Sequence, residues 1–256
     1  MKKRNLYFIP LVLSIAFGFN SCNIGEGGNI TNFPPAPAVV YTMDNMGSRT
    51  IIGTLWGGYV AVPSMQINAY PGDCLIMGFT IDYDNQPSTD YLTATNIQVT
   101  ENVEYSSLEG STSVEMGDYT LPISGVSGAT SEFLNGKFFT LASCKDKNPS
   151  FRLVYNTEEE ETGGVKNFYL LARPSSSTPN STDVSTFYAF DMSNFIYYQG
   201  RDTVISVSGS SDKLTYKYIR ANLKYFSNFS ETDQPVFANV NNPGSPVEIL
   251  IPIPSN

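Results

Sequence analysis

The sequence contains no histidine, and this absence limits the chemistry that the chain can carry out. Without an imidazole group, the serine and cysteine triads that use histidine are excluded, and so are the usual zinc and iron sites. The sequence also has no nucleophile elbow, P-loop or dinucleotide-binding glycine motif. A catalytic pair of carboxylates has no fixed spacing in a sequence, so a carboxylate-based hydrolase stays open as an alternative. We otherwise expect a protein that is not an enzyme and uses no cofactor.

Three aspartates lie close together, two in the segment Asp82-Tyr83-Asp84-Asn85 and one at Asp90. Carboxylate oxygens at such short spacing can hold calcium. The segment lacks the glycine and the distal bidentate glutamate of an EF-hand loop. A solvent-exposed turn between two strands is therefore our main interpretation, and a calcium site formed by Asp82, Asp84 and Asp90 is the alternative.

The single tryptophan, Trp56, is the best candidate for a ligand-binding residue. In the segment Leu55-Trp56-Gly57-Gly58-Tyr59, strand alternation places Leu55 and Trp56 on opposite faces, and two glycines leave space over the indole ring. Trp56 and Tyr59 could then form a platform for a sugar. Tryptophan is, however, highly buried on average. Burial of Trp56 in the core of a barrel is therefore the main interpretation, and the platform is the alternative.

Two cysteines, Cys74 and Cys144, lie in apolar segments. In an exported protein a disulfide bond between them is one possibility. Free cysteine also packs well in a core as a small apolar residue. Because the two cysteines fall in different predicted domains, we favour free thiols and keep the bond as the alternative.

The start of the chain has the order of an export signal. The basic segment Lys2-Lys3-Arg4 precedes an apolar segment, residues 6–19, that is too short to span a membrane permanently. The apolar segment ends just before Cys22, where the sequence resembles a lipobox. Acyl chains on this cysteine would anchor the protein to a membrane. We predict a signal peptide over residues 1–21, lipidation of Cys22, and a flexible tether over residues 22–37.

From Ala38 onward the apolar residues alternate or form short runs, and turn residues separate these segments. This pattern indicates an all-β protein. Five strands are expected between Ala38 and Glu104, which suits a small OB-like barrel. Further strands with regular turn spacing follow Lys137 and indicate a β-sandwich. We place the barrel in residues 38–110 and the sandwich in residues 111–256.

Several segments are similar to NigD-like lipoproteins of the Bacteroidota. Ile51-Ile52-Gly53-Thr54-Leu55, Pro71-Gly72-Asp73-Cys74-Leu75-Ile76 and Ala94-Thr95-Asn96-Ile97 resemble their amino-terminal OB-like domain. Residues 135–155 and the acidic run from Glu158 to Glu161 resemble their carboxy-terminal sandwich. The resemblance implies an OB-like barrel followed by a β-sandwich, and it implies no catalytic residue. With the predicted anchor, it leads us to expect attachment to the outer membrane, at the cell surface or the periplasmic face.

One tripeptide could carry a modification. Asp202-Thr203-Val204 resembles the short O-glycosylation signal of the same bacteria, with Thr203 as the acceptor. Three residues often match such a signal by chance. The surrounding pattern favours the start of a strand, and glycosylation of Thr203 is the alternative.

Composition limits the partners of this chain. A net charge of −9, with no basic stripe among the aromatic residues, excludes nucleic acid. We expect a cell-envelope lipoprotein that uses the membrane as a partner through its anchor and acts as a non-catalytic binding or accessory module for a glycan or a peptide. The alternative is a structural or assembly subunit whose strand edges pair with a protein partner, with the tail from Pro246 to Pro254 as a donated strand.

Overall fold

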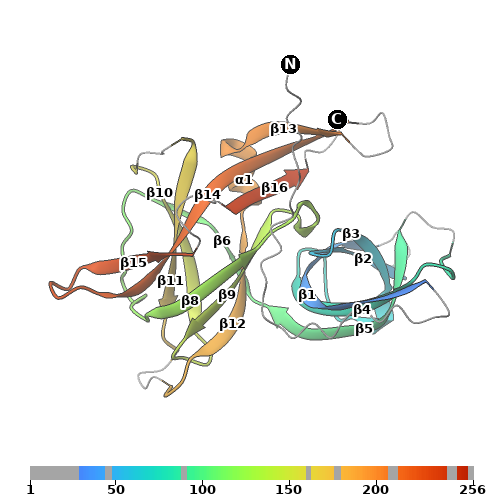
Figure 1. The fold of residues 1–256 in the computed structure, drawn as a ribbon, viewed down its shortest axis with the longest axis horizontal. Coiled ribbons are helices and arrows are strands. Elements are labelled where there is room, and N and C mark those ends of the chain that lie inside the picture. The colour runs from blue at the N-terminus through green and yellow to red at the C-terminus, as the bar shows by residue number, and fades with distance from the viewer. Residues whose placement is uncertain are drawn as a thin grey trace.

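The computed structural model describes residues 29–43, 48–87, 91–159, 163–175, 180–206, 213–240 and 247–252. These residues form a β-barrel and a two-sheet β-sandwich that lie side by side (Figure 1). A single short α-helix accompanies the strands in the described part of the chain. The predicted all-β fold, a barrel followed by a sandwich, is confirmed.

Five strands close into the barrel in the order β1-β2-β3-β5-β4. They are β1 (Ile30–Met43), β2 (Arg49–Thr54), β3 (Gly58–Pro63), β4 (Cys74–Asp82) and β5 (Leu92–Val103), with a 3-10 turn η1 (Ser64–Gln66) after β3. The long strand β1 closes the barrel, because its first part pairs with β4 and its second part with β2. Buried aliphatic side chains such as Val40, Ile52 and Leu75 fill the interior.

Strand β1 begins at Ile30, whereas the sequence indicated a flexible tether as far as residue 37. Phe33 pairs with Phe79 of β4, and their rings stack at 4.8 Å, so this segment is held in the barrel wall. The register shifts across Pro34-Pro35, which places the two prolines, with no N–H to donate, at an irregularity of the ladder. The residues from Ile30 onward are therefore barrel wall rather than tether.

The sandwich consists of two sheets. One has the order β13-β14-β11-β10-β7, with β15 and β16 also paired to β14, and the other has the order β6-β12-β9-β8. The elements are β6 (Tyr105–Ser107), β7 (Glu109–Ser111), β8 (Ile123–Ala129), η2 (Glu132–Leu134), β9 (Lys137–Cys144), β10 (Ser150–Asn156), β11 (Val165–Arg173), β12 (Val184–Asp191), α1 (Ser193–Gln199), β13 (Arg201–Ser206), β14 (Lys213–Phe229), β15 (Pro235–Asn239) and β16 (Val247–Pro252). Because β6 and β7 pair with sandwich strands, the last barrel strand ends at Val103, before the expected boundary at residue 110.

The main core lies between the two sheets. Phe138 of β9 and Phe168 of β11 are fully buried there. Helix α1 contributes Ile196 to the same core, and β16 contributes Ile249. The 17-residue strand β14 pairs with four strands and therefore organises one whole sheet.

A smaller apolar cluster joins the barrel to the sandwich. Cys74 and Ile76 of β4 pack there with Leu134 of η2. A side chain at Gly53 of β2 would overlap the carbonyl oxygen of Phe133, so glycine is what lets η2 approach the barrel so closely. The two parts therefore share a packed interface.

Candidate functional site

Trp56 lies in the turn between β2 and β3 and not in the barrel core. Its side chain is 36% exposed, and its indole Nε1–H donates a hydrogen bond to the Pro34 carbonyl at 3.0 Å. The ring also packs near Phe33, with 6.2 Å between ring centroids. Burial in the core, our main expectation for Trp56, is therefore wrong, because the tight turn carries the ring outward onto the β1 irregularity. Its use as a ligand platform stays a prediction.

Tyr59 lies in a different aromatic cluster from Trp56. Its ring contacts Tyr41 at 5.0 Å, Tyr91 at 6.3 Å and Phe133 at 5.4 Å, measured between centroids. Burial, together with smaller contributions from the neighbouring tyrosines, raises the pKa of the Tyr59 phenol to about 12. Tyr59 therefore takes part in the packing of the barrel against η2. Among the described aromatic residues, no chain of ring contacts links Tyr59 to Trp56.

Asp82 and Asp84, two of the three aspartates considered for calcium, lie in a turn closed by its own hydrogen bonds. The Asn85 side chain donates to Asp82 at 2.7 Å and lowers the pKa of that carboxyl group below its ordinary value. The backbone N–H of Asn29 donates to Asp84 at 2.9 Å. Asp90 lies outside the described residues. Among the residues that are described, no group of three or more His, Cys, Asp or Glu side chains could hold a metal ion; because Asp90 is not one of these residues, the calcium site stays a prediction.

The two internal cysteines are free thiols, so the alternative prediction of a disulfide bond between them is wrong. Cys74 lies at the barrel–sandwich interface, whereas Cys144 lies in the sandwich core, and both are buried. Burial raises the pKa of the Cys74 thiol to about 12 and also raises that of Cys144. Both side chains therefore pack as small apolar groups.

The two predicted modification sites lie in different parts of the chain. Thr203 is half-buried in the edge strand β13, opposite Tyr216 of β14, which agrees with the start of a strand; its glycosylation stays a prediction. Cys22 and the predicted signal peptide lie outside the described residues. In the part of the chain that the structure describes, no helix is long and apolar enough to cross a membrane.

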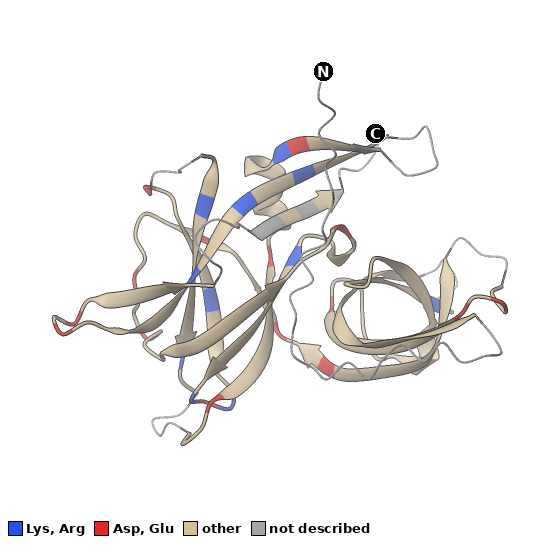
Figure 2. Cartoon of the chain, viewed as in Figure 1, with Lys and Arg blue, Asp and Glu red and all other residues tan. Residues whose placement is uncertain are grey.

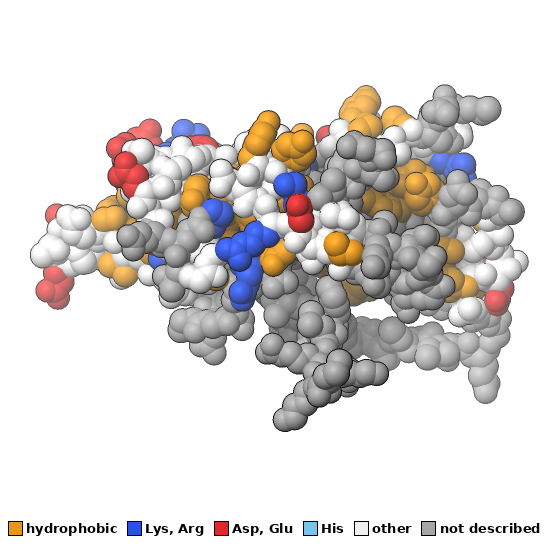
Figure 3. Space-filling model, turned by 90° about the horizontal axis from the view of Figure 1, so that it is seen from above, with side chains coloured by type: hydrophobic (Ala, Val, Ile, Leu, Met, Phe, Trp, Pro, Cys, Tyr) orange, Lys and Arg blue, Asp and Glu red, His pale blue; other side chains and the backbone are white. Residues whose placement is uncertain are grey.

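A basic hollow of about 240 Å³ lies at one end of the sandwich, where α1, β11, β13 and β14 meet. Figure 3 shows the corresponding gathering of Lys and Arg side chains near the middle of the face seen from above. Its lining residues come from three strands, the helix and the turn before β11. They are Gly164, Lys166, Gln199, Arg201, Tyr218, Ile219 and Arg220.

Strand pairing brings these residues together from distant parts of the sequence. Lys166 of β11 pairs with Ala221 of β14, next to Arg220. Arg201, the first residue of β13, pairs with Tyr218 of the same strand β14. The central strand β14 therefore positions cations of both its neighbours around one hollow.

The turn before β11 fits closely against Arg201. Gly163 and Gly164 have φ values of +66° and +74°, a region that glycine adopts without strain. A Cβ atom at position 164 would overlap the Arg201 guanidinium group. Glycine at 164 thus lets the guanidinium lie directly over the backbone of the turn.

Lys166 is the most buried cation of the hollow, with 7% of its surface exposed. Its Nζ lies 3.5 Å from the Tyr155 hydroxyl and 5.1 Å from the centroid of the Tyr155 ring. The ring of Phe195 from α1 lies on another side, at 5.6 Å. Aromatic faces stabilise a cation, and low exposure strengthens its interaction with an incoming anion.

The charge around the hollow contrasts with that of the chain. The protein has a net charge of −9, and Arg49 is the sole basic residue between Arg4 and Lys137. Figure 2 shows Lys and Arg mainly on the sandwich strands, β14 and β13 among them. Of the described residues that line the hollow, three are basic and none is acidic. The hollow is therefore suited to bind an anion.

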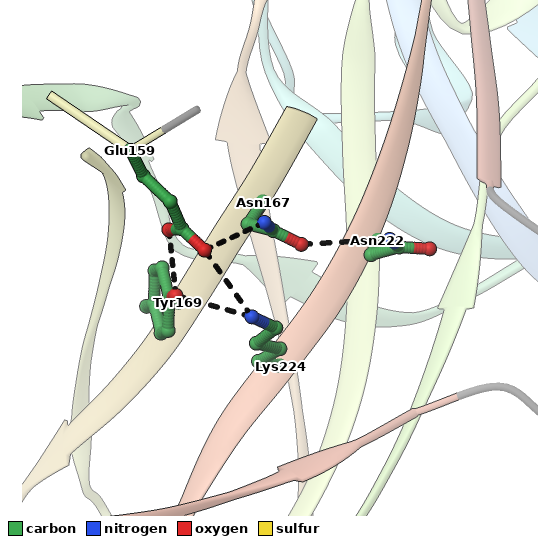
Figure 4. A network of polar contacts seen from close by, with 5 residues as sticks. All are labelled: Glu159, Asn167, Tyr169, Asn222 and Lys224. Carbon is green, nitrogen blue, oxygen red and sulfur yellow. Dashed lines mark hydrogen bonds and ion pairs between the residues drawn. The ribbon is translucent and has the colours of Figure 1, made fainter. Parts of the chain in front are cut away.

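A polar network occupies the neighbouring part of the same sheet (Figure 4). Glu159 accepts hydrogen bonds from Tyr169 and Asn167, each at 2.7 Å. Lys224 lies 3.5 Å from the Glu159 carboxylate and 3.2 Å from the Tyr169 hydroxyl, and Asn222 donates to Asn167 at 3.4 Å. Burial and Glu159 both raise the pKa of Tyr169 above its ordinary value. The polar atoms of these side chains are therefore hydrogen-bonded or ion-paired with one another. They hold the start of the acidic loop against β11 and β14.

The residues of the basic hollow were not singled out from the sequence. A partial indication was present, because Arg220 and Lys224 alternate in β14 with buried Ile219, Ala221 and Leu223, in a chain with few basic residues. The pairing of β14 with β11 and β13 is not encoded in any local pattern. Only the structure therefore shows that these residues converge on one hollow.

Comparison with known proteins identifies the fold. No family model matches the chain, and no curated protein matches it. A solved structure of an uncharacterised protein from Parabacteroides merdae is similar with a TM-score of 0.59 and 16% sequence identity, over 86% of this chain and 97% of that one. This likeness shows a shared fold and nothing more.

Two further solved structures are more distant. A candidate lipoprotein from Bacteroides fragilis has a TM-score of 0.49 and 16% identity, over 86% of this chain and 97% of its own. A NigD-like immunity protein from Bacteroides caccae has a TM-score of 0.43 and 10% identity, over 84% of this chain and 93% of its own. A NigD-like protein is thus among the solved structures similar to this chain.

Proposed function

We propose that this protein is a non-catalytic binding module of the bacterial cell envelope, and that it holds the anionic group of its ligand in the basic hollow. One observation carries the proposal. Lys166, Arg201 and Arg220 line a single hollow in a chain whose net charge is −9. A concentration of cations against the overall charge is best explained by a requirement for binding an anion at that place.

The chemistry of the cations indicates what kind of anion fits. The planar guanidinium group of Arg201 can donate two parallel hydrogen bonds to a carboxylate or a sulfate, and Arg220 adds a second guanidinium group to the lining of the hollow. Lys166 adds a third positive charge among the residues that line the hollow. A ligand with one or two charges is favoured over a long polyanion, because the acidic remainder of the protein repels extended negative charge.

The polar network beside the hollow supports binding rather than catalysis. A raised pKa keeps the Tyr169 hydroxyl protonated at neutral pH, so it is a weak nucleophile and a weak base. Glu159 is already engaged by Tyr169, Asn167 and Lys224. Nothing in this arrangement activates a reacting group.

Attachment to the envelope rests on the export signal and Cys22. Replacement of Cys22 by alanine is expected to move the protein from the detergent phase to the aqueous phase in a detergent-partitioning experiment, because acyl chains on this residue are the proposed anchor. Unchanged partitioning of the variant would contradict the lipoprotein proposal. Outer-membrane placement, on either face, belongs to the same proposal.

The described part of the tail considered as a donated strand, residues 247–252, pairs within its own chain. Strand β16 pairs with β14 over six positions, and its Ile249 and Ile251 side chains lie in the sandwich core. The assembly-subunit alternative therefore gains no support from this segment.

A titration with inorganic sulfate tests the anion site. Isotope-labelled protein at low ionic strength should show amide shifts that saturate and that concentrate at Gly164 and Gln199, as followed by nuclear magnetic resonance. Arg201→Gln should weaken this response by roughly tenfold, the expected effect of losing one charge-assisted contact. Arg173→Gln is the matched control, because it removes an exposed arginine from the far end of β11. Equal weakening by both variants, or shifts scattered over the protein, would contradict the site.

A further inference from the structure

Helix α1 places two exposed aromatic rings at the border of the basic hollow. Tyr197 and Tyr198 are 56% and 78% exposed, and their rings meet edge to face at 5.2 Å. The next residue, Gln199, lines the hollow. Because consecutive Cα atoms lie about 3.8 Å apart, the backbone of Tyr198 lies next to the hollow.

A contact from β14 fixes the position of this aromatic pair. The Nζ atom of Lys217 lies 5.7 Å from the centroid of the Tyr197 ring. The residues that follow Lys217 in β14, Tyr218 to Arg220, line the hollow. A cation–π contact therefore links Tyr197 to the strand that lines the hollow, and we call the two rings and the lining cations together the binding surface.

We infer that the ligand of this surface is an acidic saccharide, a sugar that carries a carboxylate or a sulfate group. This inference rests on the proposed function and adds the class of the ligand. The anionic group lies among Lys166, Arg201 and Arg220. The sugar ring lies against Tyr197 or Tyr198, because the C–H face of a sugar is apolar and packs on an aromatic ring.

Two features favour a saccharide over a peptide. Gln199 offers both a donor and acceptors to sugar hydroxyls, next to the aromatic pair. The hollow lies over the paired strands β11–β14 and β13–β14, whose facing backbone groups are already hydrogen-bonded to each other. Between these two ladders only Ile219 of β14 is left over, which is too short a stretch for the strand pairing that an extended peptide uses.

Isothermal titration calorimetry with three probes tests the inference. The probes are a glucuronate-containing disaccharide, its carboxyl-reduced neutral counterpart and an acidic dipeptide. The wild-type protein should bind the acidic disaccharide at least about tenfold more tightly than either other probe, since it alone provides both groups. Tyr198→Ala should weaken binding of the acidic disaccharide by roughly tenfold, the order expected for one aromatic contact.

A matched variant and a second readout separate the outcomes. Tyr70→Ala removes a tyrosine that is 68% exposed near the barrel, and it should leave binding unchanged. The sulfate response of Tyr198→Ala should equal that of the wild type, because sulfate has no ring to stack. If Tyr198→Ala behaves like Tyr70→Ala, or if the dipeptide binds as tightly as the disaccharide, the saccharide inference is overturned while the anion site stands. If Arg201→Gln changes neither sulfate nor disaccharide binding, the proposed function itself fails.

Discussion

The Lys137 ammonium group lies 2.7 Å from the Asp191 carboxylate, at the junction of the sandwich with the barrel. The side chain of Lys137 is 6% exposed, and the Tyr105 ring covers its Nζ at 4.2 Å. Asp191 also accepts a hydrogen bond from the backbone N–H of Ser193 at 2.9 Å. The pair therefore ties the start of β9 to the end of β12 and to the start of helix α1.

This ion pair predicts sensitivity to acid. Burial raises the pKa of Asp191, but hydrogen bonds from Lys137 and Ser193 outweigh it and hold the pKa below its ordinary value. A lowered folded-state pKa contributes stability above the unfolded pKa of about 3.9, and that stability is lost as the pH falls through the folded-state pKa. Urea unfolding as a function of pH should show this loss in the wild-type protein and a flatter dependence in Asp191→Asn.

The same variant should also be less stable at neutral pH. Asp191→Asn leaves the buried Lys137 without its counterion, which we expect to cost about 2 kcal/mol, less than for a fully buried pair because the Asp191 side chain is 33% exposed. Asp202→Asn is the control, since the Asp202–Lys217 pair spans 3.6 Å and the side chain of Asp202 is 65% exposed. Comparable losses in the two variants would argue against a special role for the interface pair.

A methyl group at Gly53 should disturb the barrel–sandwich interface. A Cβ atom there overlaps the Phe133 carbonyl oxygen, so the backbone of η2 must move away. We expect Gly53→Ala to lower the free energy of unfolding by about 1–3 kcal/mol, the usual range for overpacking. Gly125→Ala in β8 has no atom within 4 Å of the added group and should be close to neutral. Thermal denaturation of both variants provides the comparison.

The buried thiols should be unreactive until the protein unfolds. Because burial raises the pKa of Cys74 to about 12, the thiolate is scarce at pH 8, and Cys144 is buried as well. In a form that starts after Cys22, a thiol reagent should modify neither cysteine in the native protein and both in denaturant, without any reductant. A disulfide would instead appear as two thiols that become reactive only after reduction.

Fluorescence of the single tryptophan should report a partly exposed ring that is remote from ligand binding. At 36% exposure, Trp56 should show emission between that of a buried and a free indole and partial quenching by iodide. Addition of the acidic disaccharide should leave this emission unchanged, because Trp56 contacts Phe33 and Pro34 of the barrel, whereas the hollow belongs to the sandwich. A saturable spectral change on titration would move the binding site toward the barrel.

The fold class could be predicted because alternation and turn spacing are local properties of the sequence. The start of the barrel could not, since Pro34-Pro35 has the composition of a linker and its strand is stabilised by the distant ring of Phe79. Trp56 was misplaced for a related reason. The two glycines after it form a turn with positive φ, which ends the strand alternation on which burial was predicted.

The hollow was harder to predict than the fold. Lys166, Arg201 and Arg220 are isolated cations in three separate segments, and each resembles an ordinary exposed residue of a strand. They meet because β14 pairs in parallel with β11 and antiparallel with β13. Such pairings depend on long-range packing, so no local sequence motif indicates the site.

The near absence of basic residues from the barrel has a consequence for encounters in solution. Arg49 is the sole cation of the barrel, whereas three of the sandwich cations line the hollow, so the positive potential is concentrated at the hollow. An anionic ligand is repelled as it diffuses toward the barrel and attracted as it nears the cations on β13 and β14. Since this field extends about 10 Å at an ionic strength of 0.1 M, it orients the ligand before contact and should make the association rate decrease as salt is added.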